Sequence, residues 1–236
     1  MPARPPRTER IIIPGPAGAV EALVEIPEPH DAGHFGVVCH PHPLYGGTLE
    51  NKVVHTLARA FQELGAATIR FNFRGVGGST GAFDHGRGEV DDALAVVAYG
   101  RQIFSGAALW LAGFSFGGAI AVKSAARAQP ARLVVVAPGV TILDVGTDAP
   151  SCPWLIVQGG ADDVIEPRYV LDWASKLPPP RPRHEKDRVT GPEIRVLEGA
   201  GHFFHGRLPD LRQAVLAFMR GGAMPGASEP SASAQN

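Results

Sequence analysis

Hydrophobic residues along the chain follow two alternating patterns. Short runs rich in β-branched residues, such as 132–137, have the length of buried strands. Longer segments such as 50–64 repeat apolar residues every three or four positions, as an amphipathic helix does. The alternation predicts a mostly parallel sheet with helices on both faces. The expected strands are 10–13, 20–26, 35–40, 67–73, 108–114, 132–137, 154–158 and 194–198, and the expected helices are 50–64, 89–104, 117–128, 167–177 and 208–220.

The two ends of the chain and one internal segment break this pattern. Between 10–13 and 20–26 only P-G-P-A-G-A intervenes, which predicts an antiparallel hairpin at the sheet edge. Residues 178–192 are rich in proline and charge and predict an exposed loop. We expect a flexible segment at 1–9, one domain at 10–220 and a disordered tail at 221–236.

Composition excludes several classes of function. The 236 residues carry a formal net charge of −1 and no basic cluster, so nucleic-acid binding is not expected. The apolar runs are strand-sized, which predicts no membrane span. Cys39 and Cys152 lie far apart without metal-site or disulfide-scaffold spacing, which favours the reducing cytoplasm.

The strongest local motif is G-F-S-F-G-G at 113–118, which follows an expected strand and opens an expected helix. This context is typical of a nucleophile elbow, where Gly113 and Gly117 remove side chains that would collide across a tight turn. Ser115 would then stand at a helix N-terminus, where peptide N–H groups favour developing negative charge.

A serine nucleophile needs a base, and the base needs an orienting acid. Two acidic candidates, Asp162 and Asp163, follow the strand W-L-I-V-Q, and two histidines, His202 and His205, follow the strand I-R-V-L-E. The order Ser, Asp, His along the chain is that of the α/β-hydrolases.

Five motifs together resemble this superfamily, and within it the small bacterial esterase-like members related to dienelactone hydrolases. They are H-P-H-P-L-Y-G-G-T at 40–48, F-R-G-V-G-G-S-T-G at 73–81, G-F-S-F-G-G, Q-G-G-A-D-D-V-I and G-A-G-H-F-F. The resemblance implies a three-layer α/β/α sandwich with about eight strands. It also implies Asp162 as the acid and His202 as the base. One departure is Gln158, where many relatives carry histidine.

The same resemblance implies an oxyanion hole made of two peptide N–H groups. Phe116, directly after the nucleophile, would give the first. The segment after strand 35–40 would give the second, and Pro41 and Pro43 have no N–H. His42, Leu44 and Tyr45 remain, and we favour Leu44.

Metal binding is a weaker interpretation of the histidines in these motifs. His40 and His42 could bind a metal with His202 and His205, but no metal-site spacing accompanies them, so we expect no metal and no cofactor. Loop hydrogen bonding is the expected role of His40 and His42.

The glycine-rich segment 73–81 lacks the Lys-Ser/Thr ending of a phosphate loop, so nucleotide binding is not expected. We expect this segment to shape a loop beside the active site instead. Arg74 would be held there by carboxylates or carbonyls, with Asp91 or Asp92 as candidate partners.

The predicted substrate is a small-molecule ester or thioester. Only residues 138–153 separate the strands between which a cap usually enters, so we expect an open cleft without a cap domain. Candidate apolar wall residues are Tyr45, Phe83, Phe116, Val164 and Phe203.

The expected activity is that of a carboxylic ester hydrolase acting through an acyl-enzyme. A thioesterase or acyltransferase would use the same three residues, and a peptidase is a more distant alternative. A non-catalytic binding protein on the same fold is the other class considered. The chain is expected to be a monomer or a homodimer.

Overall fold

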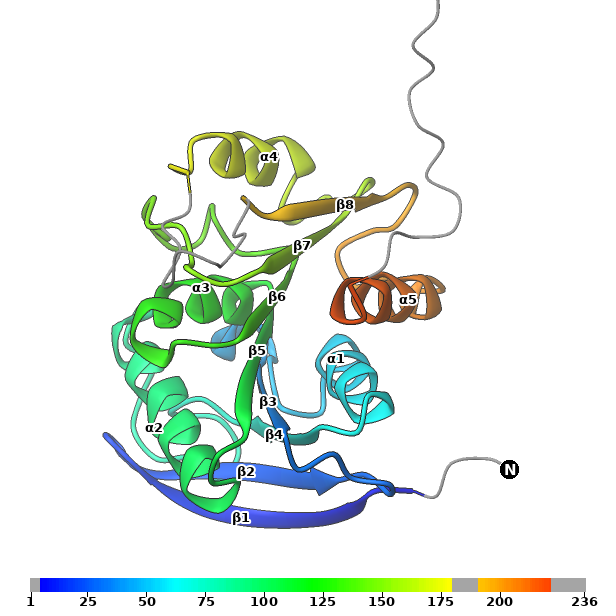
Figure 1. Ribbon diagram of the computed structural model, residues 1–236. Coiled ribbons are helices and arrows are strands. Elements are labelled where there is room, and N and C mark those ends of the chain that lie inside the picture. The colour runs from blue at the N-terminus through cyan, green and yellow to red at the C-terminus, as the bar shows by residue number, and fades with distance from the viewer. Residues whose placement is uncertain (1–4, 180–190, 222–236) are drawn as a thin grey trace, which may run out of the picture.

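The computed structural model describes residues 5–179 and 191–221 (Figure 1). Eight strands form one sheet in the order β1-β2-β4-β3-β5-β6-β7-β8. The strands are β1 (Arg7–Gly15), β2 (Gly18–Ile26), β3 (His34–Cys39), β4 (Ala67–Phe71), β5 (Ala108–Phe114), β6 (Arg132–Val136), β7 (Trp154–Gly159) and β8 (Glu193–Leu197). The helices are α1 (Lys52–Glu63), α2 (Arg87–Ile103), α3 (Phe116–Ala128), α4 (Pro167–Ser175) and α5 (Leu208–Met219), with a 3₁₀ turn η1 (Pro43–Tyr45).

The sheet is parallel from β4 to β8 and antiparallel at its β1–β2 end. Interior strands such as β7 are buried along their whole length, because helices cover both faces of the sheet. The predicted mostly parallel, eight-stranded sheet and the predicted edge hairpin are both confirmed. The parallel strands therefore point their carboxyl ends toward one edge of the sheet, which is where loops of a functional site gather.

Helices α1 and α5 lie on one face of the sheet, and α2, α3 and α4 lie on the other (Figure 1). Each face has its own hydrophobic core. Phe61 of α1 and Val215 of α5 belong to one core, and Val96 of α2 and Ile120 of α3 belong to the other. The predicted three-layer sandwich is confirmed, and the helical face expected in 50–64 is buried as the apolar spacing required.

The predicted boundaries need one correction at the N-terminus. Strand β1 begins at Arg7, so the expected flexible segment 1–9 is too long. Arg7, Thr8 and Glu9 pair with Ile26, Glu25 and Val24 of β2. Residues 1–4, most of the expected loop at 178–192 and nearly all of the expected tail lie outside the described residues.

The connection between β6 and β7 contains no cap. Residues 137–153, all of which the structure describes, form neither helix nor strand. The sheet edge next to this connection is therefore left without a covering domain, as predicted. In the described ranges, no helix is both long enough and apolar enough to cross a membrane.

Candidate active site

Ser115 occupies a strained turn between β5 and α3. Its φ of 55° and ψ of −120° are unusual for a residue with a side chain. The start of the turn is joined to the end of β6 by a hydrogen bond from the Ser115 N–H to the Val136 carbonyl, 2.9 Å long. A Cβ added to Gly113 would lie 2.1 Å from the Gly117 carbonyl oxygen, and one added to Gly117 would lie 2.3 Å from the His40 carbonyl oxygen. Glycine is therefore required at both positions for the chain to pass so closely.

The structure brings Ser115, His202 and Asp162 into one hydrogen-bonded row. His202 Nε2 lies 3.1 Å from Ser115 Oγ, and His202 Nδ1 lies 2.9 Å from Asp162 Oδ2. Each of the three residues is only 4% exposed. Because Nδ1 faces a carboxylate, its proton is directed to Asp162, and Nε2 is left to accept the serine proton.

The Asp162 carboxylate accepts four hydrogen bonds. Its Oδ1 accepts from the N–H groups of Val164 and Ile165, at 3.0 and 2.8 Å. Its Oδ2 accepts from Gln158 Nε2 at 3.0 Å, beside the bond from His202. Asp163 is exposed, so of the two acidic candidates only Asp162 contacts a histidine among the described residues.

Two candidate oxyanion donors, the peptide N–H groups of Phe116 and His42, have no hydrogen-bond partner within residues 5–179 and 191–221. Phe116 is the first residue of α3, where helical N–H groups have no partner in the helix. The other N–H group is that of His42, whose ring centroid lies 4.9 Å from that of Phe116. By contrast, the Leu44 N–H donates to His42 Nδ1 at 3.2 Å and the Tyr45 N–H donates to the His42 carbonyl at 3.1 Å.

His40 holds the segment 41–47 against the sheet. Its ring is fully buried, with Nδ1 at 2.6 Å from the Pro41 carbonyl oxygen and Nε2 accepting from the Phe73 N–H at 3.0 Å. Burial lowers the pKa of His40 to about 4, so the imidazole is neutral at pH 7. A neutral ring is what this pairing needs, since one nitrogen must donate and the other must accept. The sequence predicted a loop hydrogen bond for His40. It did not predict that this ring would connect the ends of β3 and β4.

The glycine-rich loop after β4 is fixed by Arg74. Its guanidinium donates to both carboxylate oxygens of Asp92, with distances of 2.9 and 2.8 Å, and to the Gly88 carbonyl at 2.8 Å. Asp92 is buried on the inner side of α2, whereas Asp91 pairs with Arg127 at the surface. Of the two candidates, Asp92 is therefore the partner. The loop in turn presents Phe83, whose ring centroid lies 4.9 Å from that of His42.

The predicted wall residues fall into two groups. Phe83 and Phe116 pack with the His42 ring beside the turn that carries Ser115. Tyr45, Val164 and Phe203 are more exposed, at 84%, 53% and 46%. Phe203 contacts the His202 ring, while His205 is exposed and its ring lies tilted against that of Phe203.

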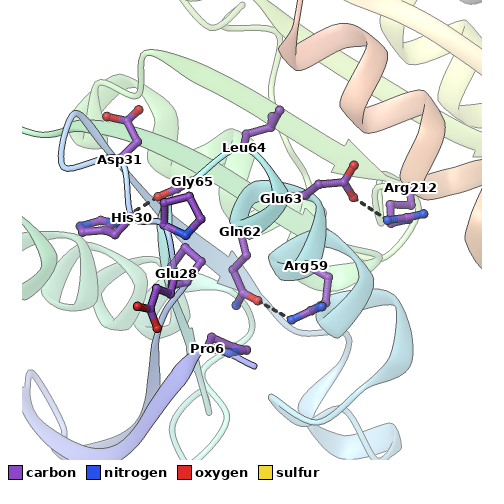
Figure 2. A pocket seen from close by; sticks show the side chains of 12 residues that line it. Pro6, Glu28, His30, Asp31, Arg59, Gln62, Glu63, Leu64, Gly65 and Arg212 are labelled. Carbon is purple, nitrogen blue, oxygen red and sulfur yellow. Dashed lines mark hydrogen bonds and ion pairs between the residues drawn. The ribbon is translucent and has the colours of Figure 1, made fainter. Parts of the chain in front are cut away.

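The hollow drawn in Figure 2 does not include Ser115, Asp162 or His202. It has a volume of about 690 Å³ and is lined by residues around the turn 27–31 and the end of α1. Its charged side chains are mixed in sign, and Glu63 pairs with Arg212 across it. The turn 27–31 precedes β3 and the end of α1 precedes β4, so the hollow lies by the amino ends of these strands, whereas Ser115 follows the carboxyl end of β5. No group of three or more His, Cys, Asp or Glu side chains that could hold a metal occurs within the part of the chain described.

A mostly parallel eight-stranded sheet, with the strained Ser115 turn after β5 and helices on both faces, defines an α/β hydrolase. Comparison with known proteins gives the same class. A family model described as serine aminopeptidase, S33, matches residues 44–150. The chain is 37% identical to a lidless α/β serine hydrolase of Xanthomonas campestris, with a TM-score of 0.82 over 95% of this chain and 100% of that one.

Two further relatives cover most of the chain. An α/β serine hydrolase homologue of Coxiella burnetii is 42% identical, with a TM-score of 0.77 over 88% of this chain and 95% of that one. An uncharacterized protein of Rickettsia prowazekii is 32% identical over 212 residues, which are 87% of this chain and 86% of the relative. The chain belongs to the α/β serine hydrolase family.

Proposed function

We propose that this protein is a serine esterase that cleaves small carboxylic esters through an acyl-enzyme. The observation that carries the proposal is the row of hydrogen bonds from Ser115 through His202 to Asp162. Each residue is buried and comes from the loop after a different parallel strand, so the sheet fixes their separation. Such a constellation is recognised by geometry and by the role of each group.

In the proposed mechanism, Ser115 Oγ attacks the ester carbonyl carbon as its proton passes to His202 Nε2. Asp162 holds the ring and stabilises the imidazolium that forms. The tetrahedral intermediate collapses, the C–O bond to the alcohol breaks, and the alcohol leaves with the proton from Nε2. Water then attacks the acyl-enzyme, gives its proton to Nε2, and the acid is released as the proton returns to Ser115.

The oxyanion of each tetrahedral intermediate needs two aligned donors. We propose the Phe116 N–H as the first. For the second, the unengaged N–H of His42 is better supported than that of Leu44, because the Leu44 N–H already donates to the His42 ring. Leu44 would serve only if the His42 ring turned away.

The exposed side chains of Tyr45, Val164 and Phe203, as candidate wall residues, suit substrates whose acyl group is small or projects into solvent. A thioester fits the same chemistry, since only the leaving group differs. The cytoplasmic location and a monomeric or homodimeric state remain predictions from the sequence.

A turnover screen tests the proposal. The panel contains p-nitrophenyl esters and acyl thioesters of graded chain length, with an aminoacyl p-nitroanilide to represent peptidases. We expect hydrolysis of short esters by the native protein and none by Ser115→Ala. Turnover confined to thioesters or to the anilide would replace the esterase proposal, and equal turnover by Ser115→Ala would remove the serine mechanism.

A further inference from the structure

Gln158 is a fully buried amide beside the candidate acid, and the proposed triad mechanism does not use it. It lies near the end of β7, four positions before Asp162. Its Nε2 donates to Asp162 Oδ2 at 3.0 Å and to the Ile165 carbonyl at 2.9 Å. Both amide hydrogens are thus directed at the loop that carries the acid.

The amide orientation follows from its neighbours. With the amide turned over, Oε1 would face a carboxylate oxygen and a peptide carbonyl, which are both acceptors. In the observed orientation, Gln158 Oε1 has no partner among the described residues. A buried acceptor without a partner destabilises the folded protein. The two hydrogen bonds that Nε2 donates must therefore stabilise it by more than the unpaired Oε1 destabilises it.

The oxygen that receives this bond is also the one that faces the base. Asp162 Oδ2 accepts from His202 Nδ1 at 2.9 Å, so Gln158 and His202 share one carboxylate oxygen. A donor on a carboxylate stabilises its charge and reduces its attraction for a second proton. Gln158 therefore weakens the hold of Asp162 on the imidazolium form of His202.

We propose that Gln158 is a positioning residue that holds the Asp162 carboxylate and sets the pH at which His202 becomes an active base. This inference rests on the proposed function. Besides Asp162, His202 contacts Ser115 Oγ and the rings of Phe114 and Phe203. Asp162 is the only charged group that these contacts place against it.

The test uses Gln158→Met, which keeps the length of the side chain and removes both donors together with the unpaired acceptor. The rate of Ser115 labelling by a fluorophosphonate is measured against pH. Without the Gln158 donor the imidazolium is held more strongly, so the midpoint of the rising limb should move up by about half a pH unit or more. Gln62→Met is the matched control, because Gln62 is a buried glutamine whose Nε2 donates to Thr68, away from the site.

A midpoint that moves in Gln158→Met but not in Gln62→Met supports the proposal. An unchanged midpoint in a folded, labelled Gln158→Met overturns it and leaves the triad intact. If native protein is not labelled at all, the proposed function fails first and the inference fails with it.

A measurement on the native chain covers the case in which Gln158→Met does not fold. In ¹⁵N-labelled protein, the side-chain amide signal of Gln158 should shift with pH in step with the labelling rate, while that of Gln62 should not. A Gln158 signal that stays constant across the labelling midpoint would overturn the proposal without any substitution.

Discussion

Replacing Asp162 by asparagine removes one charge while keeping the shape of the side chain. The native carboxylate accepts four hydrogen bonds, two on Oδ1 from Val164 and Ile165 and two on Oδ2 from Gln158 and His202. An asparagine amide offers only one oxygen. Whichever way it turns, its NH₂ group meets two donors.

This geometry determines how much activity and how much stability Asp162→Asn should lose. If the NH₂ group faces His202, Nδ1 must become an acceptor and Nε2 then carries the proton, so Ser115 loses its base. The same change of tautomer in another Ser-His-Asp enzyme lowers kcat by about 10⁴, or about 5 kcal/mol in the barrier. Two lost bonds to a charged group should also lower the free energy of unfolding by about 3 kcal/mol or more.

The assay is the rate of Ser115 labelling by a fluorophosphonate, with urea unfolding measured in parallel. Asp163→Asn is the matched control, because this neighbouring carboxylate is exposed and should change neither quantity appreciably. Labelling by Asp162→Asn within tenfold of native, or an equal loss in Asp163→Asn, would refute the assignment of the acid.

Three further predictions concern the surroundings of Ser115. Because burial lowers the pKa of His40 to about 4, the unfolded chain binds a proton that the folded chain does not as the pH falls from about 6.5 to 4. Urea unfolding should therefore show native protein losing roughly 3 kcal/mol more over this range than His40→Gln, and equal losses would contradict the argument. Gly113→Ala should cost about 3 kcal/mol or more, or prevent folding, because its Cβ would meet backbone 2.1 Å away. Gly106→Ala, where the added Cβ would have open space but φ is +81°, should lower the free energy of urea unfolding by only about 1 kcal/mol, and similar losses at both sites would count against the close approach. Ester turnover should rise as the pH is raised from acid values, since only neutral imidazole can accept the serine proton, and a flat profile would argue against His202 as the base.

The order of strands and helices could be predicted because buried strands and amphipathic helices leave different periods in the sequence. The predicted start of β1 was late because Arg7, Thr8 and Glu9 look like a polar terminus, although they pair with β2. Arg10, the first residue of the predicted strand, forms ion pairs with Glu21 of β2 and with Glu50. An edge strand tolerates such residues, and their pairing depends on partners that sequence patterns do not specify.

Within the site, the residue types could be predicted more readily than their hydrogen bonds. The choice between Asp91 and Asp92 depends on which side of α2 faces the sheet, and the choice among His42, Leu44 and Tyr45 depends on how η1 closes on the His42 ring. Gln158 stood out in the sequence as a departure from histidine. Its contact with Asp162 emerges only when the loop after β7 folds back on the strand end.

The central claim is that Ser115 is an activated nucleophile, and intact-mass measurement after treatment with a fluorophosphonate tests it most directly. Native protein and Ser115→Ala are compared at neutral pH, with the fold of both checked by circular dichroism. We expect the mass increase of a single phosphonyl group on the native chain and none on the variant. No mass increase on folded native protein, or the same increase on Ser115→Ala, would contradict this claim.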